Sequence, residues 1–79
     1  AGPADPDLLA ALKAKRLELA RAQQVPAYVV FPDATLVAMA ALRPTSREAL
    51  RTVSGVGEVK LERYGDAFLA LLRTHGAGP

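Results

Sequence analysis

The side chains that most often perform catalysis are scarce in this sequence. His75 is the only histidine among 79 residues, and there is no cysteine. A lone histidine lacks the second ligand or thiolate that a metal site or an activated nucleophile needs. Glu58 and Glu62 lie one helical turn apart, but such a pair on a short exposed helix usually faces water instead of acting as acid and base. Walker-type and dinucleotide-binding motifs are also absent. We therefore expect no catalytic residue, no metal site and no cofactor.

The clearest binding motif is the turn over residues 53–57 (Val-Ser-Gly-Val-Gly). Gly55 can adopt the positive φ angle that ends a helix, which lets Val56 enter a core. Gly57 leaves the first backbone N–H groups of the next helix uncovered, and such groups attract phosphate. The turn therefore fits a helix-hairpin-helix that holds a nucleic-acid backbone through Gly55 and Gly57. The alternative is a tight connection between two helices with no ligand.

A pair of arginines is a second candidate for phosphate contact. Arg47 and Arg51 lie one turn apart on one face of a short predicted helix. Like charges at this spacing repel each other unless an anion lies opposite. Simple exposure to solvent, with Glu48 nearby, is the alternative interpretation.

Tyr28 is the candidate for contact with a base. It lies on a segment between two prolines, where a ring can remain exposed. An exposed tyrosine flanked by basic residues can stack on an unpaired base. The alternative is a ring packed in the core with its hydroxyl group at the surface.

Most of these residues are positioned by helices. The first predicted helix begins at about Asp7, with either Asp5 or Asp7 as its cap, and ends at Gln23 or Gln24 before a Val-Pro pair. One face is apolar: Leu8, Leu9, Ala11, Leu12, Leu19 and Ala20. Lys15 lies inside this stripe and Leu17 on roughly the opposite face, so both break the pattern.

Residues 27–32 (Ala-Tyr-Val-Val-Phe-Pro) have strand propensity but no second strand to pair with. A lone strand would leave its backbone hydrogen bonds unmet. We therefore predict an extended or 3₁₀ connector whose apolar side chains fill the core.

Two short helices are predicted next. Asp33 is expected to cap a helix from Ala34 to Ala41 or Leu42, which offers three residues for burial: Leu36, Val37 and Ala40. Thr45 and Glu48 then match a capping box and predict a helix over residues 46–52.

The last predicted helix runs from Glu58 to about His75. Its core stripe has spacings of three, four and four residues: Leu61, Tyr64, Phe68 and Leu72. Gly65 interrupts the pattern and indicates a kink, a break before Asp66, or a close contact between helices. Taken together, the segments predict a compact all-α bundle of five short helices.

Composition bounds the class of protein. The length suits one domain, over residues 7–75, between Ala/Gly/Pro-rich linkers at 1–6 and 76–79. A net charge of +2 permits a nucleic-acid partner without requiring one. The absence of cysteine fits a reducing, cytoplasmic setting. There is no signal-peptide pattern and no apolar run near the roughly 20 residues that span a membrane, so we expect no membrane partner.

Two blocks of the sequence resemble the HRDC (helicase and RNase D C-terminal) domain. The first contains Leu12-Lys13, Arg16 and Leu19-Ala20, followed by residues 25–36 (VPAYVVFPDATL). The second contains residues 43–46 (RPTS), 53–57 and 60–69 (KLERYGDAFL). The resemblance spans about Leu8 to Arg73, and the Val-Pro-x-Tyr-Val-Val-Phe form is most similar to bacterial RecQ-type DNA helicases.

This resemblance implies a monomeric five-helix bundle without activity of its own. It would be an accessory module that helps an ATP-dependent RecQ helicase engage single-stranded or branched DNA in repair and recombination. In related domains the tyrosine of the Val-Pro-x-Tyr segment contacts single-stranded DNA, which corresponds to Tyr28. Charge alone adds candidate phosphate contacts: Arg16, Arg21, Arg47, Arg51, Lys60 and Arg63.

Two departures from the family pattern lie on the first helix. Lys15 replaces a bulky apolar residue, and Leu17 stands where a polar or basic residue is more usual. An exposed leucine beside weakened basic character indicates a protein contact. The alternative function is therefore a regulatory module that docks on the parent helicase core or another protein. The RNase D branch of the family, in which the module would help bind RNA, is a third option.

Overall fold

The computed structural model describes residues 4–76, which contain five α-helices and no strand. The helices are α1 (Pro6–Gln23), α2 (Ala27–Val30), α3 (Asp33–Leu42), α4 (Arg47–Arg51) and α5 (Gly57–Gly76). The prediction of an all-α bundle with five helices is confirmed. Residues 1–3 and 77–79, which belong to the expected linkers, lie outside the described residues.

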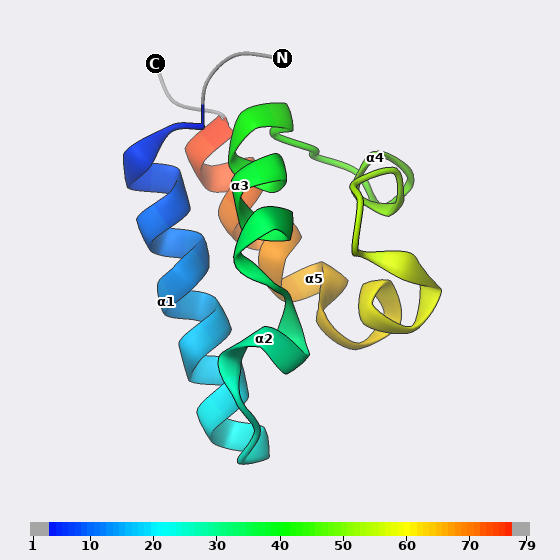
Figure 1. Cartoon of the computed structure of the whole chain (residues 1–79). Helices are drawn as coiled ribbons and strands as arrows, with labels where there is room; N and C mark the ends of the chain where they lie inside the picture. Colours follow the sequence, from blue (N-terminus) through cyan, green and yellow to red (C-terminus); the bar gives the residue numbers. More distant parts are fainter. Residues whose placement is uncertain (1–3, 77–79) are drawn as a thin grey trace.

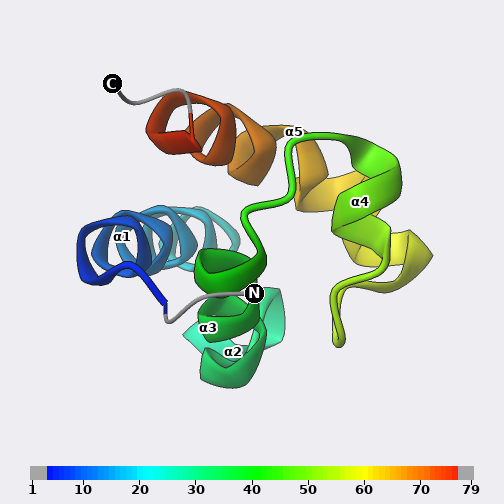
Figure 2. The same ribbon diagram turned by 90° about the horizontal axis from the view of Figure 1, so that it is seen from above.

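Helix α1 forms one side of the bundle and packs against α2, α3 and α5. α3 runs back along α1, and α4 lies to one side against the first half of α5 (Figures 1 and 2). An ion pair between Arg43 Nη2 and Asp5 Oδ2, 3.0 Å apart, joins the end of α3 to the start of α1. The bundle is therefore closed at this end by charge and along its length by apolar packing.

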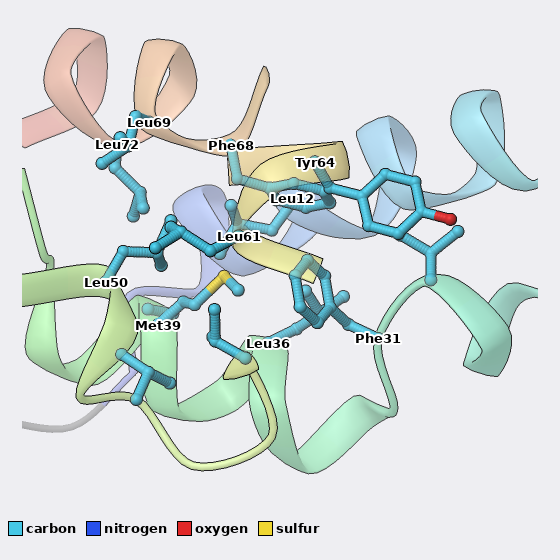
Figure 3. Packing of buried hydrophobic residues seen from close by; sticks show 14 of the residues in the cluster. Leu12, Phe31, Leu36, Met39, Leu50, Leu61, Tyr64, Phe68, Leu69 and Leu72 are labelled. Carbon is cyan, nitrogen blue, oxygen red and sulfur yellow. The ribbon is translucent and has the colours of Figure 1, made fainter. Parts of the chain in front are cut away.

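The core is centred on Phe31, which follows α2. Its ring is fully buried and makes edge-on contacts with the rings of Tyr64 and Phe68, with centroid distances of 5.9 and 5.1 Å. Figure 3 shows these three rings together with Leu36 of α3 and Leu61 of α5. All four residues of the predicted α5 stripe are buried: Leu61, Tyr64, Phe68 and Leu72. That prediction is confirmed.

The apolar stripe of α1 is also confirmed in its main part, because Leu8 and Leu12 are fully buried and Leu19 is partly buried. The two exceptions noted in the sequence point outward. Lys15 pairs with Glu18 at 2.7 Å, and Leu17 is 44% exposed. On α3, Val37 is exposed, so its predicted burial is wrong.

The expected connector at residues 27–32 is wrong in its first part, where Ala27–Val30 forms a single α-helical turn. Val29 N–H donates to the carbonyl of Pro26 at 3.0 Å, which satisfies a backbone group without a partner strand. An extended chain would place Val30 and Phe31 on opposite sides. The turn instead buries both and leaves Tyr28 exposed.

Two predicted helix caps are corrected. Pro32 occupies the cap position of α3, and Asp33 is its first residue, with no side-chain capping bond. At α4 the cap is Ser46, whose Oγ accepts from Ala49 N–H at 3.1 Å, so the Thr45–Glu48 capping box is wrong by one residue. The Thr45 carbonyl accepts a hydrogen bond from Arg73 Nε at 2.9 Å, which holds this residue outside the helix.

Helix α5 runs through Gly65 without a break. A Cβ atom at this position would lie 2.9 Å from Leu61 Cδ1 and 3.9 Å from Arg47 Nη1. The expected break before Asp66 is therefore absent. The missing side chain leaves room for Leu61 of the same helix, and Arg47 of α4 lies at an ordinary van der Waals distance.

The Gly-Val-Gly turn behaves as predicted at Gly55, which has φ +93°, and at Val56, which is buried. Gly55 also approaches α3 closely. An added Cβ would lie 2.2 Å from Oγ1 of the buried Thr35, and this hydroxyl donates to the Ser54 carbonyl at 3.1 Å. The turn is therefore docked on α3 by a polar contact that only glycine accommodates.

We predict that Gly55→Ala destabilises the domain by about 2–4 kcal/mol, because it adds backbone strain and displaces the Thr35 hydroxyl from its acceptor. Gly57→Ala is the matched control: its φ is +62°, but nothing lies within 4 Å of the added Cβ. It should cost about 1–2 kcal/mol from backbone strain alone. Urea denaturation gives both values. In a Thr35→Ala background the Gly55→Ala cost should fall, and equal costs in the two backgrounds would contradict the clash.

Candidate nucleic-acid interface

Tyr28 lies on the outer side of α2, with 68% of its surface exposed. Among the two interpretations of this residue, the structure supports the exposed ring. Its backbone is held by the burial of Val30 and Phe31, two and three residues later in the chain. The ring is therefore displayed from a short, anchored turn.

Two cations approach the segment that follows Tyr28. Arg16 Nη1 donates to the Phe31 carbonyl at 2.9 Å, and Lys60 Nζ lies 5.7 Å from the centroid of the Phe31 ring. Arg16 comes from α1 and Lys60 from α5. The segment after α2 therefore lies between two helices that each bring a positive charge to it.

Arg16 is engaged in structure. Only 11% of its side chain is exposed, and Nη1 also lies 2.7 Å from Asp33 Oδ1. Its Nε is buried without a hydrogen-bond partner among the described residues. The predicted phosphate contact through Arg16 would require the loss of contacts that link α1 to the start of α3. Its observed position is that of a support beneath α2.

The ion pair with Arg16 changes the pKa of Asp33. The hydrogen bond from Arg16 lowers the pKa of the Asp33 carboxyl below its usual value of 3.8, and the Coulomb attractions of Arg16 and Lys13 act in the same direction. Lys13 was not among the candidates chosen from charge. Its position three residues before Arg16 was the available signal, because that spacing places both on neighbouring parts of one helix face.

The predicted arginine pair of α4 meets carboxylates of α5. Arg47 Nη1 lies 2.8 Å from Asp66 Oδ1, and Arg51 Nε lies 2.9 Å from Glu58 Oε1. The anion required opposite two like charges is thus supplied by the protein itself. Glu58 also lies in the first turn of α5, beside the N–H groups that Gly57 was expected to expose to phosphate.

Among the lysines and arginines of residues 4–76, five form no ion pair, and one of these, Arg73, donates a hydrogen bond to the Thr45 carbonyl. The side chains of the other four form neither an ion pair nor a hydrogen bond in this range: Lys13, Arg21, Lys60 and Arg63. Two belong to α1 and two to α5, the helices on either side of Phe31. Over the same residues there is no cluster of potential metal ligands. No helix in this range is long and apolar enough to span a membrane.

Comparison with known proteins places this arrangement in a family. The model of the HRDC domain matches residues 5–72. The chain belongs to the HRDC domain family. The fold agrees: D. radiodurans RecQ HRDC domain 3 superposes with a TM-score of 0.86 and 40% identity, covering 91% of this chain and 95% of that one.

Sequence relatives are larger proteins that contain such a domain. The ATP-dependent DNA helicase RecQ of Haemophilus influenzae is 45% identical over 73 residues, which cover 92% of this chain and 12% of that protein. The ATP-dependent DNA helicase UvrD2 of Mycobacterium tuberculosis is 51% identical over 73 residues, covering 92% of this chain and 10% of that protein. The HRDC chain thus spans about a tenth of these helicases.

The Arg16–Asp33 pair predicts a pH dependence of HRDC stability. Because the folded-state pKa of Asp33 is depressed, its contribution is fully present above the unfolded value of 3.8 and is lost as the pH falls through the lower folded value. Asp33→Asn should therefore lower the melting temperature at pH 7, and the difference from wild type should shrink below pH 3.8. Melting temperatures measured from pH 7 downward test this. In an Arg16→Met background the pH-dependent part of the difference should shrink to the smaller contribution of Lys13, and an unchanged difference would contradict the pairing.

Proposed function

We propose that this HRDC domain is a non-catalytic, nucleic-acid-binding module of a DNA helicase, and that it holds single-stranded DNA through Tyr28. The observation that carries the proposal is the exposed Tyr28 ring on a turn that is anchored by the buried side chains of Val30 and Phe31. Stacking of a base on such a ring contributes roughly 1–3 kcal/mol. A ring whose backbone is already fixed loses little conformational entropy on binding, which favours this position.

Phosphate contacts complete the proposed interface. Four cationic side chains form neither an ion pair nor a hydrogen bond inside residues 4–76: Lys60 and Arg63 of α5, and Lys13 and Arg21 of α1. They lie on the two helices that flank the Phe31 segment. Arg16 supports α2 from within.

The Gly-Val-Gly turn is a weaker part of the proposed interface. Contacts through the N–H groups of Gly55 and Gly57, and through Arg47 and Arg51, would have to compete with carboxylates already in place, such as Glu58. We therefore place the main contact at α2 and its flanking helices.

The parent protein is proposed to be an ATP-dependent DNA helicase of bacterial type that acts in DNA repair and recombination in the cytoplasm. The relatives named RecQ and UvrD2 support this, since both are called ATP-dependent DNA helicases. In either setting the domain would engage single-stranded or branched DNA while the remainder of the protein unwinds it.

One observation favours a second candidate function, docking on the parent helicase core or another protein. The solvent face of α3 carries no charged side chain between Asp33 and Arg43, and Val37 and Leu42 are exposed on it. Leu17 of α1 is exposed as well. Uncharged helix faces of this kind are typical of surfaces that another protein covers.

We predict that Tyr28→Ala weakens binding of the isolated domain to labelled single-stranded DNA roughly 5- to 100-fold at every salt concentration, because stacking is lost. Tyr28→Phe keeps the ring and is the control, with near wild-type affinity. Fluorescence anisotropy across a salt series gives both constants. No detectable binding of the wild type at low salt would exclude autonomous DNA binding and favour the docking function.

The combined variant Lys60→Gln/Arg63→Gln should reduce the slope of log affinity against log salt by about 1.4, from about 0.7 for each phosphate contact to a single strand. Lys15→Gln/Arg43→Gln removes the same charge from residues paired with Glu18 and Asp5 and is the matched control. Equal slopes for the two variants would mean that overall charge, and not this interface, governs binding.

A further inference from the structure

The α4–α5 hairpin sets two arginines against a row of three carboxylates. Arg51 pairs with Glu58 at 2.9 Å, while Arg47 pairs with Asp66 at 2.8 Å and approaches Glu62 at 3.7 Å. The three acids recur every four residues, which places them on successive turns along one edge of α5. That edge faces α4.

Gly65 lies beside this row. A Cβ atom at this position would lie 3.9 Å from Arg47 Nη1, an ordinary van der Waals distance. The guanidinium group therefore lies over Gly65, where no side chain competes for the space, and it reaches two carboxylates on adjacent turns of α5.

The charges on the facing edges do not balance. Two arginines of α4 meet three carboxylates of α5. The pairs are largely exposed, and exposed pairs are individually weak and easily broken. A phosphate that displaced one carboxylate from Arg47 or Arg51 would still lie beside the acids left behind. Repulsion from that row, and not the strength of the pairs, keeps phosphate away.

We propose that the carboxylate row Glu58, Glu62 and Asp66 is an autoinhibitory contact that closes the α4–α5 hairpin to nucleic-acid phosphate. The row masks an arginine pair that would otherwise form a second phosphate site. Where the domain binds DNA as proposed above, the row also confines the strand to the Tyr28 side. The masking of the arginines is inferred from the hairpin geometry alone, and only the confinement of the strand rests on the proposed function.

The test is to unmask the arginines. Glu58→Gln/Asp66→Asn removes both short ion pairs, and binding of the domain to a labelled oligo-thymidine strand is measured across a salt series. We expect an affinity at least about 5-fold higher at low salt and a slope steeper by about 1.4, because two further phosphates are neutralised. Adding Arg47→Gln/Arg51→Gln should abolish the gain.

The matched control is Asp7→Asn/Glu48→Gln. It raises the net charge by the same amount, but neither acid forms an ion pair within residues 4–76, so both arginines stay paired. An equal gain in this control would overturn the proposal, since it would reflect net charge alone. Circular dichroism confirms that each variant is folded. The single changes Glu58→Gln and Asp66→Asn, each loosening one arginine, should each show part of the gain.

The two proposals fail separately. If the wild type does not bind but Glu58→Gln/Asp66→Asn does, the masking stands and autonomous binding through Tyr28 fails. If the wild type binds through Tyr28 and the unmasked variant gains nothing, the masking fails and the Tyr28 interface stands.

Discussion

Phe31 is held on both its side chain and its backbone. Its ring lies against Tyr64 and Phe68 of α5, while its carbonyl oxygen accepts a hydrogen bond from Arg16 of α1. This residue therefore fixes the distance between two long helices and the exit of the chain from α2. The exposure of Tyr28 follows, because a single helical turn that buries Val30 and leads into a buried Phe31 leaves Tyr28 and Val29 on the outside. Changes at Phe31 would reach the core and the candidate interface together.

The basic side chains on the surface of the domain differ in whether the protein itself supplies them with a partner. The net charge is +2, yet most of the arginines form ion pairs with carboxylates or donate hydrogen bonds to backbone carbonyls. What distinguishes one face from another is the number of cations left without such partners. The helices α1 and α5 beside the Phe31 segment carry cations without such partners, whereas the arginines of the α4–α5 hairpin are paired with carboxylates. A pattern of this kind separates positive charge that supports the fold from positive charge available to a ligand.

The sequence predicted the long helices and the α5 core stripe because apolar spacing is a local property that survives packing. It also predicted Gly55, since a positive φ is a requirement of the backbone itself. The turn at residues 27–30 was missed because the β-branched residues Val29 and Val30 favour an extended chain, and tertiary burial of Phe31 overrode that preference. Val37 was assigned to the core from residue type alone, although the helix has only one side to bury.

The candidate site was less predictable for a related reason. Tyr28 was identified from its motif, and the structure then decided between an exposed and a packed ring. Whether a given arginine is available depends on residues distant in sequence: Arg16 meets Asp33, and Arg47 meets Asp66. No local spacing reveals such partners. The spacing of Lys13 from Arg16 was visible in the sequence, but its proximity to Asp33 arises only when α1 and α3 pack.

The two tyrosines occupy opposite environments, and the chain has no tryptophan. Tyr64 is buried and donates its hydroxyl hydrogen to Gln23 Oε1 at 2.9 Å, whereas Tyr28 is open to water. The intrinsic ultraviolet emission of the domain therefore comes from one reporter inside the bundle and one on its surface. A denaturant would change the first and a stacking ligand the second. Folding and occupancy of the α2 surface are thus optically separable in the unlabelled protein, with a Tyr28→Phe variant isolating the interior signal.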